Sequence, residues 1–191
     1  MPVAINDAGW IVGDPIVLGP AGFGDEAVLW SPSGKATVLQ DAGGPGSVAN
    51  AINDAGKSVG VSDLSGFQDV VLWSPSGQAT VRENPGGIGP SVQSQALAII
   101  ASGWSVGFSY NQTGTQDAVL WSPSGKVTNL GAVLGSAWTD TEAVGINNRG
   151  DILDSGDYDG GHYGFLLAPV SASESAFTVT LQGVSRSHLE A

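Results

Sequence analysis

An all-β fold made of four copies of one unit is predicted by three features of this sequence. The first is a short motif, Ala-Ile-Asn-Asp-Ala-Gly, which begins at Ala4 and returns unchanged at Ala51. Altered copies begin at Ala98 and Gly145, so the four starts are 47 residues apart. The second feature is a wealth of turn formers, with 29 Gly and 10 Pro in 191 residues. The third is a recurrent apolar string that ends in Leu-Trp. A fixed period of this length is typical of repeat architectures.

Each unit is predicted to contain four strands, and the second unit shows them most clearly. Its predicted strands are residues 47–53, 57–62, 69–74 and 79–83. The first of them alternates small and larger apolar residues, as a half-buried strand does. Asp54-Ala55-Gly56 is predicted to form the first turn, because Asp bonds its own backbone and Gly accepts positive φ. Ser74-Pro75-Ser76-Gly77 is a second turn, with Pro at its second position.

Four antiparallel strands in a unit of this length are typical of a β-propeller blade. A small sheet cannot bury both faces alone, so such units stack on one another. We therefore predict a four-bladed β-propeller in a single domain of residues 1–182, with a linear stack of hairpins (a β-solenoid or β-prism) as the alternative. The predicted blades are residues 3–40, 47–83, 92–130 and 141–182.

Closure of the ring is expected to come from apolar packing between residues 1–13 and the unit that ends at Gln182. In that last unit, residues 176–182 resemble the fourth strand of the first unit and are predicted to form its outer strand. Residues 183–191 are predicted to be a tail outside the fold that derives partly from cloning.

The charge and composition exclude several classes of function. The net charge is −12 and the sequence pI is near 4.1. Because phosphate backbones and anionic lipids repel so acidic a protein, nucleic-acid binding is not expected. No apolar run approaches the length of a membrane-spanning helix, so membrane insertion is not expected either. The absence of Cys removes disulfides and thiolate nucleophiles.

Three Trp residues occupy one repeated position, and two others occupy a second one. The first three end the Leu-Trp strings: Trp30, Trp73 and Trp121. We interpret them as wedges between neighbouring sheets, where a large ring buries apolar area and its N–H finds a carbonyl. Trp10 and Trp104 instead open the second strand, where Lys57 and Asp151 stand in the other two units. A position this variable is expected at the surface, so Trp10 and Trp104 are candidate ligand-binding residues.

With the repeat aligned, the chain resembles the HAF-repeat proteins, a family of bacterial repeats. Their two motifs are a strand ending in Ala-Phe-Leu-Trp and a stretch like Gly-Ile-Asn-x-x-Gly-x-Val-Val-Gly. The first is matched by residues 27–30, 70–73, 118–121 and 164–167, and the second by residues 5–13 and their copies. The resemblance covers almost the whole chain. Where the family has a His before Ala-Phe, this chain has Glu26, Asp69, Asp117 and Tyr163.

The resemblance implies a secreted or periplasmic bacterial protein and implies no particular chemistry. No signal peptide is recognised at the start of the sequence, where the first repeat begins almost at once.

One acidic stretch in the fourth unit is the densest candidate for chemistry. Asp151, Asp154, Asp157 and Asp159 lie within twelve residues of His162, the one His inside the predicted fold. Hard oxygen ligands with Gly in tight turns suit Ca²⁺, so Asp154, Asp157 and Asp159 are candidate calcium ligands. His162 is then the candidate general base. An ordinary solvated Asp-Gly loop is the alternative.

A second candidate comes from repetition. Two sets of polar residues recur at equivalent positions, one in the first turn (Asp7, Asp54, Asn148) and one at the start of the third strand (Glu26, Asp69, Asp117). Equivalent residues of a propeller form a ring, so either set is expected to gather on one face.

Two functions remain open from the sequence. In the first, the protein is an exported binding module that presents Trp10, Trp104 and its acidic loops to a small molecule, a carbohydrate or a protein. In the second, it is a calcium-dependent hydrolase of the lactonase or esterase type, in which the metal activates water.

Overall fold

Almost all regular structure in the described part of this chain is β-strand, chiefly in four antiparallel sheets of four strands each. The computed structural model of the chain describes residues 1–14, 16–19, 22–44, 46–64, 67–85, 93–169 and 177–180. Each sheet comes from one repeat, and within each sheet the strands follow one another in sequence order. The predicted all-β fold of four antiparallel four-stranded units is confirmed.

The four sheets are numbered here in chain order. Sheet 1 contains β1 (Pro2–Ile5), β2 (Ile11–Gly13), β5 (Val28–Trp30) and β6 (Ala36–Val38). Sheet 2 contains β7 (Ser47–Ile52), β8 (Ser58–Leu64), β9 (Phe67–Trp73) and β10 (Ala79–Val81). Sheet 3 contains β11 (Ser94–Ile99), β12 (Ser105–Tyr110), β13 (Gln116–Trp121) and β14 (Val127–Asn129). Sheet 4 contains β15 (Trp138–Ile146), β16 (Ile152–Tyr158), β17 (Gly161–Pro169) and β18 (Phe177–Thr180).

Three details add to the predicted pattern. A separate two-stranded sheet, β3 (Ile16–Gly19) with β4 (Gly22–Asp25), lies between the second and third strands of sheet 1 in sequence. One short helix, α1 (Leu130–Leu134), follows sheet 3 and is capped by the Asn129 side chain, which accepts from the Ala132 N–H. The predicted outer strand of the fourth unit is present as β18, which pairs with β17. Residue 176, residues 181–182 and the predicted tail lie outside the described residues.

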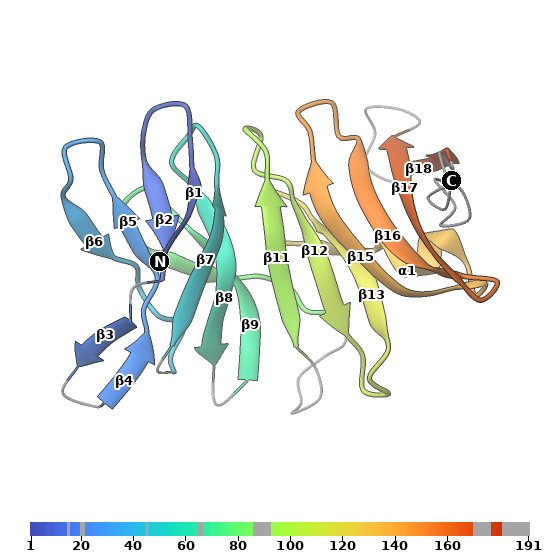
Figure 1. The fold of residues 1–191 in the computed structure, drawn as a ribbon, viewed down its shortest axis with the longest axis horizontal. Coiled ribbons are helices and arrows are strands. Elements are labelled where there is room, and N and C mark those ends of the chain that lie inside the picture. Colours follow the sequence, from blue (N-terminus) through green and yellow to red (C-terminus); the bar gives the residue numbers. More distant parts are fainter. Residues whose placement is uncertain are drawn as a thin grey trace, which may run out of the picture.

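The first strands of the four sheets lie side by side and bring all four first turns to the same end of the molecule. β1 contacts β7, β7 contacts β11, and β11 contacts β15. Figure 1 shows these strands in the middle of the view, with their turns at the top and with sheet 1 and sheet 4 at opposite ends of the long axis. In each of these turns a Gly with φ between 74° and 91° reverses the chain (Gly9, Gly56, Gly103, Gly150).

Extensive packing in the described residues joins only sheets that are consecutive in the sequence. Val3 and Ile5 on β1 are exposed, so the expected packing that would close the ring on residues 1–13 is not seen in this part of the chain. The structure thus shows four stacked sheets and does not show a closed four-bladed ring.

One apolar cluster fills each of the three junctions between sheets. Trp73 and Trp121 are fully buried in two of them, and each indole N–H donates to a carbonyl of the preceding unit. Trp73 Nε1 donates to the Gln40 carbonyl at 2.7 Å, and Trp121 Nε1 donates to the Glu83 carbonyl at 2.8 Å. The interpretation of these two residues as wedges between sheets is confirmed. Trp30, on sheet 1, is only half-buried.

A buried Gly recurs where the second strand crosses the first. A Cβ on Gly60 would lie 1.9 Å from the Val48 carbonyl oxygen, and the same distance applies to Gly13 and Gly107 with their own partners. The fourth unit has Asp154 at this position, and Asp154 is fully buried. β15 carries an extra bulge nearby, between Thr139 and Glu142. We attribute the room for the Asp154 side chain to this bulge.

Candidate binding site at the hairpin turns

The first turns of all four sheets line one open hollow of about 310 Å³. Each sheet contributes three consecutive residues, and each set lies 47 residues after the one before it. The lining residues are Ile5, Asn6, Asp7, Ile52, Asn53, Asp54, Ile99, Ile100, Ala101, Ile146, Asn147 and Asn148. The expectation that Asp7, Asp54 and Asn148 gather on one face therefore agrees with this arrangement.

Asn side chains at the second lining position hold three of the four turns in shape, while the third turn has Ile100 there. Asn6 Oδ1 accepts from the Trp10 N–H at 2.9 Å, and Asn53 Oδ1 accepts from the Lys57 N–H at 3.0 Å. Both Asn side chains are almost completely buried. A buried amide that closes its own turn in this way fixes the backbone that carries the lining residues.

The turns are also bonded to one another across the sheet junctions. Asn6 Nδ2 donates to the Asn53 carbonyl at 2.9 Å, and Asn53 Nδ2 donates to the Ile100 carbonyl at 3.0 Å. Next to these bonds, the Asp7 N–H donates to Asp54 Oδ1 at 3.1 Å. The Ala101 N–H likewise donates to Asn148 Oδ1, at 3.2 Å. The wall of the hollow is thus one connected set of hydrogen bonds.

The hollow combines carboxylates, amides and apolar side chains in its lining. Its lining includes the exposed carboxylates of Asp7 and Asp54, and it includes no Lys, Arg or His. The four equivalent Ile residues supply the apolar part. Such a lining suits ligands rich in hydroxyl or cationic groups, and it repels anions.

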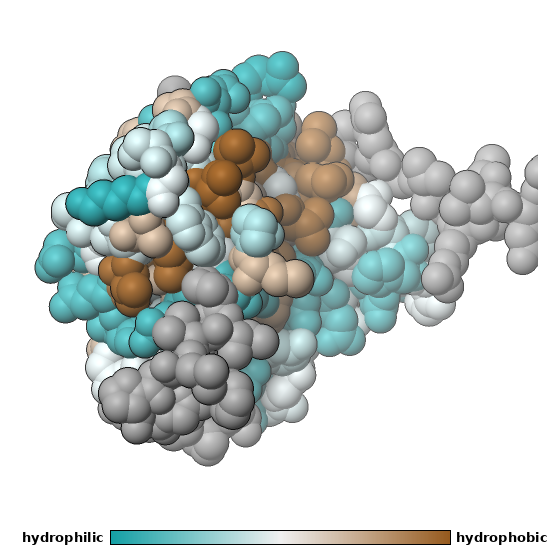
Figure 2. Space-filling view, turned by 60° about the vertical axis from the view of Figure 1, so that its left-hand side comes forward, coloured by the Kyte–Doolittle hydropathy of each residue, from teal (hydrophilic) through white to brown (hydrophobic). Residues whose placement is uncertain are grey.

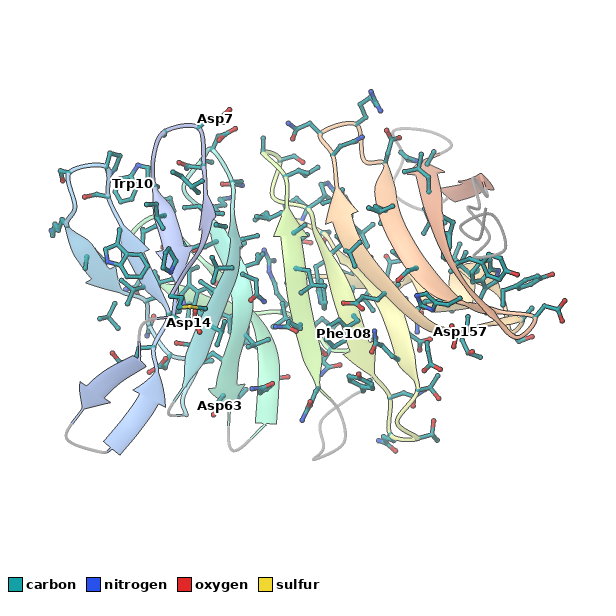
Figure 3. All side chains as sticks on the ribbon, in the orientation of Figure 1. Asp7, Trp10, Asp14, Asp63, Phe108 and Asp157 are labelled. Atoms are coloured by element: carbon teal, nitrogen blue, oxygen red, sulfur yellow. The ribbon has the colours of Figure 1, made fainter. Side chains whose placement is uncertain are left out.

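A smaller hollow of about 130 Å³ lies next to the second turn and brings in one of the candidate Trp residues. Trp10, Leu29, Gly56 and Pro75 are among its lining residues, and Asp54 lines both hollows. Figure 3 shows Trp10 and Asp7 toward the turn end of the molecule and Asp63 at the opposite end. An indole and a carboxylate therefore lie close together beside the second turn.

Trp10 and Trp104 differ from the expectation that both are surface residues. Each is half-buried and packs against the apolar cluster that its own sheet shares with the next sheet. Trp104 follows the third turn directly, so it lies at the same end as Trp10. It lines neither of the two hollows described above. Of these two Trp residues, Trp10 is therefore the one that lines one of the two described hollows.

The acidic stretch of the fourth unit is divided between the two faces of sheet 4. Asp154 points into the junction with sheet 3, whereas Asp157, three residues later, belongs to the opposite face because side chains alternate along a strand. Asp157 and His162 are directly opposed on β16 and β17, and Asp157 Oδ1 lies 2.6 Å from His162 Nδ1. Both side chains of this pair are about half exposed. Asp159 occupies the following turn, with a φ of 47°.

Asp154 has an unusual environment for a carboxylate. Neither of its side-chain oxygens has a hydrogen-bond partner of ordinary geometry. Burial raises the pKa of Asp154 to about 7, while the nearby backbone N–H groups of Ser155 and Glu142 oppose the shift and the Glu142 charge adds to it.

The three candidate calcium ligands are not brought together in the described part of the chain. No group of three or more His, Asp or Glu side chains there is close enough to hold one metal ion. Asp154 lies on the inner face, Asp157 on the outer face and Asp159 in the turn beyond them. The calcium hypothesis stays a prediction.

Two features of the site were missed from the sequence. The first is the hydrogen bond between successive turns, for which the Asn repeated at positions 6, 53 and 147 was an available signal. The second is an aromatic cluster on sheet 4, in which the Trp138 ring lies 5.0 Å from Tyr158 and 4.4 Å from Phe165 between centroids. Trp138 has no Trp at the equivalent position of the other units, so repetition gave no sign of it.

No family model matches this chain, and no curated protein matches it. The resemblance to the HAF-repeat proteins therefore stays a prediction. Within the described ranges, no helix is both long enough and apolar enough to span a membrane.

Proposed function

We propose that this protein is an exported binding module that holds a carbohydrate chain in the hollow at its hairpin turns. One observation carries the proposal: equivalent residues of all four repeats meet at one hollow, beside a half-buried indole. Binding sites are typically concave and mostly apolar, with a few well-placed polar groups.

The chemistry of the lining favours hydroxyl-rich ligands. Carboxylates and carbonyls accept hydrogen bonds from sugar hydroxyls, and amides both donate and accept. Asp54 supplies a carboxylate and Trp10 supplies an aromatic surface for the apolar face of a sugar ring. Because Asp7 and Asp54 line the hollow and the chain carries a net charge of −12, anionic sugars are expected to be rejected.

The proposal includes an open, propeller-like arrangement, in which the four sheets are blades around the hollow and the ring is not closed between sheets 1 and 4 within one chain. Contacts between successive first strands support this arrangement. The equivalence of the four turns at one end supports it as well.

The test is calorimetric titration of the protein with cellohexaose, maltohexaose and chitohexaose, and with oligogalacturonate as the anionic comparison. We expect at least one neutral oligosaccharide to bind and oligogalacturonate not to bind. Asp54→Ala and Trp10→Ala should each weaken binding about tenfold or more, which corresponds to about 1.4 kcal/mol.

Asp63→Ala is the matched control, since Asp63 lies at the end of the molecule opposite to the turns. It should leave the affinity unchanged. Absence of binding to all three neutral sugars, or an equal loss in the Asp63 variant, would contradict the proposal.

A hydrolase is the second candidate, and the Asp157–His162 pair is the observation that favours it. A carboxylate 2.6 Å from an imidazole nitrogen can orient a general base. The pair lies on the outer face of sheet 4, so its activity would be independent of the hollow. His162→Ala should abolish hydrolysis of a panel of lactones and esters if this candidate holds, with and without added calcium. A rate unchanged in that variant removes the candidate.

A further inference from the structure

In the described residues, sheets 1 and 4 each have one uncovered face. At each of the three internal junctions the equivalent face is covered by the neighbouring sheet. Val12, Val59 and Val106 are equivalent residues, each 0% exposed because the next sheet covers them. Leu153 occupies the same position in sheet 4, where no sheet of the described residues covers it, and it is 52% exposed. Sheet 4 thus presents an open face with an apolar residue at the position that is covered in sheets 1 to 3, and the exposed Asp157–His162 pair lies farther along the same face.

The opposite face of sheet 1 is open in the same way. Ile52 and Trp73 lie in one cross-strand row of sheet 2, are 9% and 0% exposed, and pack against sheet 1. Their equivalents in sheet 1 are Ile5, which is 67% exposed, and Trp30, which is half-buried. In Figure 2, which turns the sheet 1 side forward, hydrophobic residues lie among polar ones on this side of the molecule.

The first and last turns also carry groups that form hydrogen bonds between neighbouring turns elsewhere in the molecule. In the described residues these groups have no neighbouring turn to bond. Asp54 and Asn148 each accept a backbone N–H from the preceding turn through a side-chain oxygen. Asp7 presents the same acceptor, and no residue of the described part donates to it. At the other end Asn147, the equivalent of Asn53, has no following turn in the part of the chain that the structure describes.

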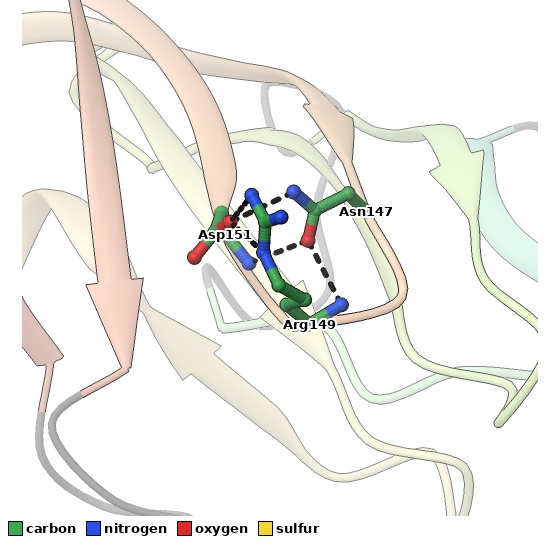
Figure 4. A network of polar contacts seen from close by, with 3 residues as sticks. All are labelled: Asn147, Arg149 and Asp151. Carbon is green, nitrogen blue, oxygen red and sulfur yellow. Dashed lines mark hydrogen bonds and ion pairs between the residues drawn. The ribbon is translucent and has the colours of Figure 1, made fainter.

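Instead of bonding a following turn, the Asn147 side chain forms a hydrogen bond within its own turn. Its Nδ2 donates to Asp151 Oδ2 at 2.8 Å instead of to a following carbonyl, and Arg149 bonds the same carboxylate oxygen (Figure 4). In the internal junctions an Asn amide donates to a backbone carbonyl, and the side chain at the next position accepts a backbone N–H. The equivalent partners between the two ends are therefore Asn147 Nδ2 with the Asn6 carbonyl, and the Asn148 N–H with Asp7 Oδ1.

We propose that a second copy of this chain packs its sheet 1 against sheet 4 and so repeats the internal junction between chains. A second copy fits these faces because each of the three internal junctions joins the same two faces through equivalent apolar rows. A contact between two different faces is head-to-tail, and it closes into a ring when the rotation per copy allows it. Figure 1 shows sheets 1 and 4 of one chain at opposite ends of the long axis, and no extensive packing joins them in the described residues.

The first test is the molar mass of the full chain, measured by size-exclusion chromatography with light scattering at about 10 and about 200 μM. We expect a dimer or a larger assembly at the higher concentration. A monomer at both concentrations overturns the proposal.

The second test uses charged substitutions on each open face. Ile5→Asp and Leu153→Asp should each give a monomer, because each buries a carboxylate in the new junction. Val133→Asp is the matched control, since Val133 is 44% exposed on α1 and lies on neither open face. Val133→Asp adds the same charge and should keep the wild-type mass. Ile5 and Leu153 are more than half exposed, so both variants are expected to fold, and circular dichroism checks this.

Mixing the two variants distinguishes a head-to-tail contact from a symmetric one. The Ile5→Asp chain keeps an intact sheet 4 face, and the Leu153→Asp chain keeps an intact sheet 1 face. An equimolar mixture should therefore form a dimer although each variant alone is monomeric. A Leu153→Asp chain that still assembles alone would mean that like faces pair, and this result overturns the proposal. A mixture that stays monomeric overturns it too.

Discussion

Sheets 2 and 4 are one repeat in two different settings. Sheet 2 has neighbours on both faces, keeps Gly60 where its first two strands cross, and places Trp73 in a fully buried position. Within the described residues sheet 4 has one neighbouring sheet, carries Asp154 at the Gly position and exposes Leu153. The comparison shows that the repeated residue types are kept where two sheets or two strands pack closely, as at Gly60 and Trp73. They differ where a bulge or an open face gives room.

The largest expected effect comes from adding one methyl group to sheet 2. Gly60→Ala places a Cβ 1.9 Å from the Val48 carbonyl oxygen, so the backbone of β7 or β8 must move. We expect a loss of more than about 4 kcal/mol in the free energy of unfolding, or failure to fold. Gly164→Ala in sheet 4 is the control, because nothing lies within 4 Å of its added Cβ. A urea-denaturation midpoint for Gly60→Ala equal to that of Gly164→Ala would refute the close approach.

The next effect concerns the Trp wedge. Trp73→Ala should cost about 3–5 kcal/mol, since the ring is fully buried and its N–H is hydrogen-bonded to Gln40. Trp30→Ala should cost much less, because Trp30 is half-buried on the open face of sheet 1. Equal losses for the two variants in chemical denaturation would mean that the face of sheet 1 is covered.

Asp154 gives the fourth sheet a pH dependence that its Gly equivalents lack. Its pKa is raised by burial from 3.8 to about 7, so the folded state binds a proton that the unfolded state has released between these values. This contribution to stability is therefore fully present below about pH 4 and is lost as the pH rises to 7. A shift of about three pKa units sets a ceiling of about 4 kcal/mol.

Asp154→Asn isolates this contribution, because Asn does not titrate. Relative to Asp154→Asn, the wild type should lose roughly 2 kcal/mol of unfolding free energy between pH 4 and pH 7. A difference that stays constant over this range would show that Asp154 is solvated.

The smallest effect is at the turns. Asn53→Ala removes bonds to the Lys57 N–H and to the Ile100 carbonyl from a buried position, and should cost about 2 kcal/mol. Asn147→Ala removes the equivalent side chain where it is exposed, and should cost less than about 1 kcal/mol. Thermal unfolding of the two variants measures the difference, and a reversed order would contradict the assignment of bonds between turns.

Much of the fold could be predicted because the signals are local. The period of 47 residues located the four units, and the Asp-Ala-Gly and Ser-Pro-Ser-Gly turns located the strand ends. The wedge role of Trp73 and Trp121 followed from an apolar string that repeats. These features depend only on neighbours within one unit or on the next identical unit.

The remaining features depend on geometry that the period does not encode. The rotation from one sheet to the next decides whether the ring closes, and no residue pattern states it. The bulge before Glu142 is needed before Asp154 can be placed in the interior. Strand alternation then separates Asp154 from Asp157, which the sequence count alone had grouped into one cluster. The hollow at the turns needed all four units placed together.

Amide hydrogen exchange followed by mass spectrometry tests the central claim, that sheets 1 and 4 are ends and sheets 2 and 3 are interior. The protein is measured at a dilution at which mass photometry shows single chains. Terminal units of a stacked array open more readily than internal ones, because they have one neighbour each. We therefore predict slow exchange for strands β7 to β9 and β11 to β13, and exchange at least tenfold faster for β1, β2 and β16. Equal protection in all four sheets would contradict the account, since it is the result expected of a closed ring in which no sheet is terminal.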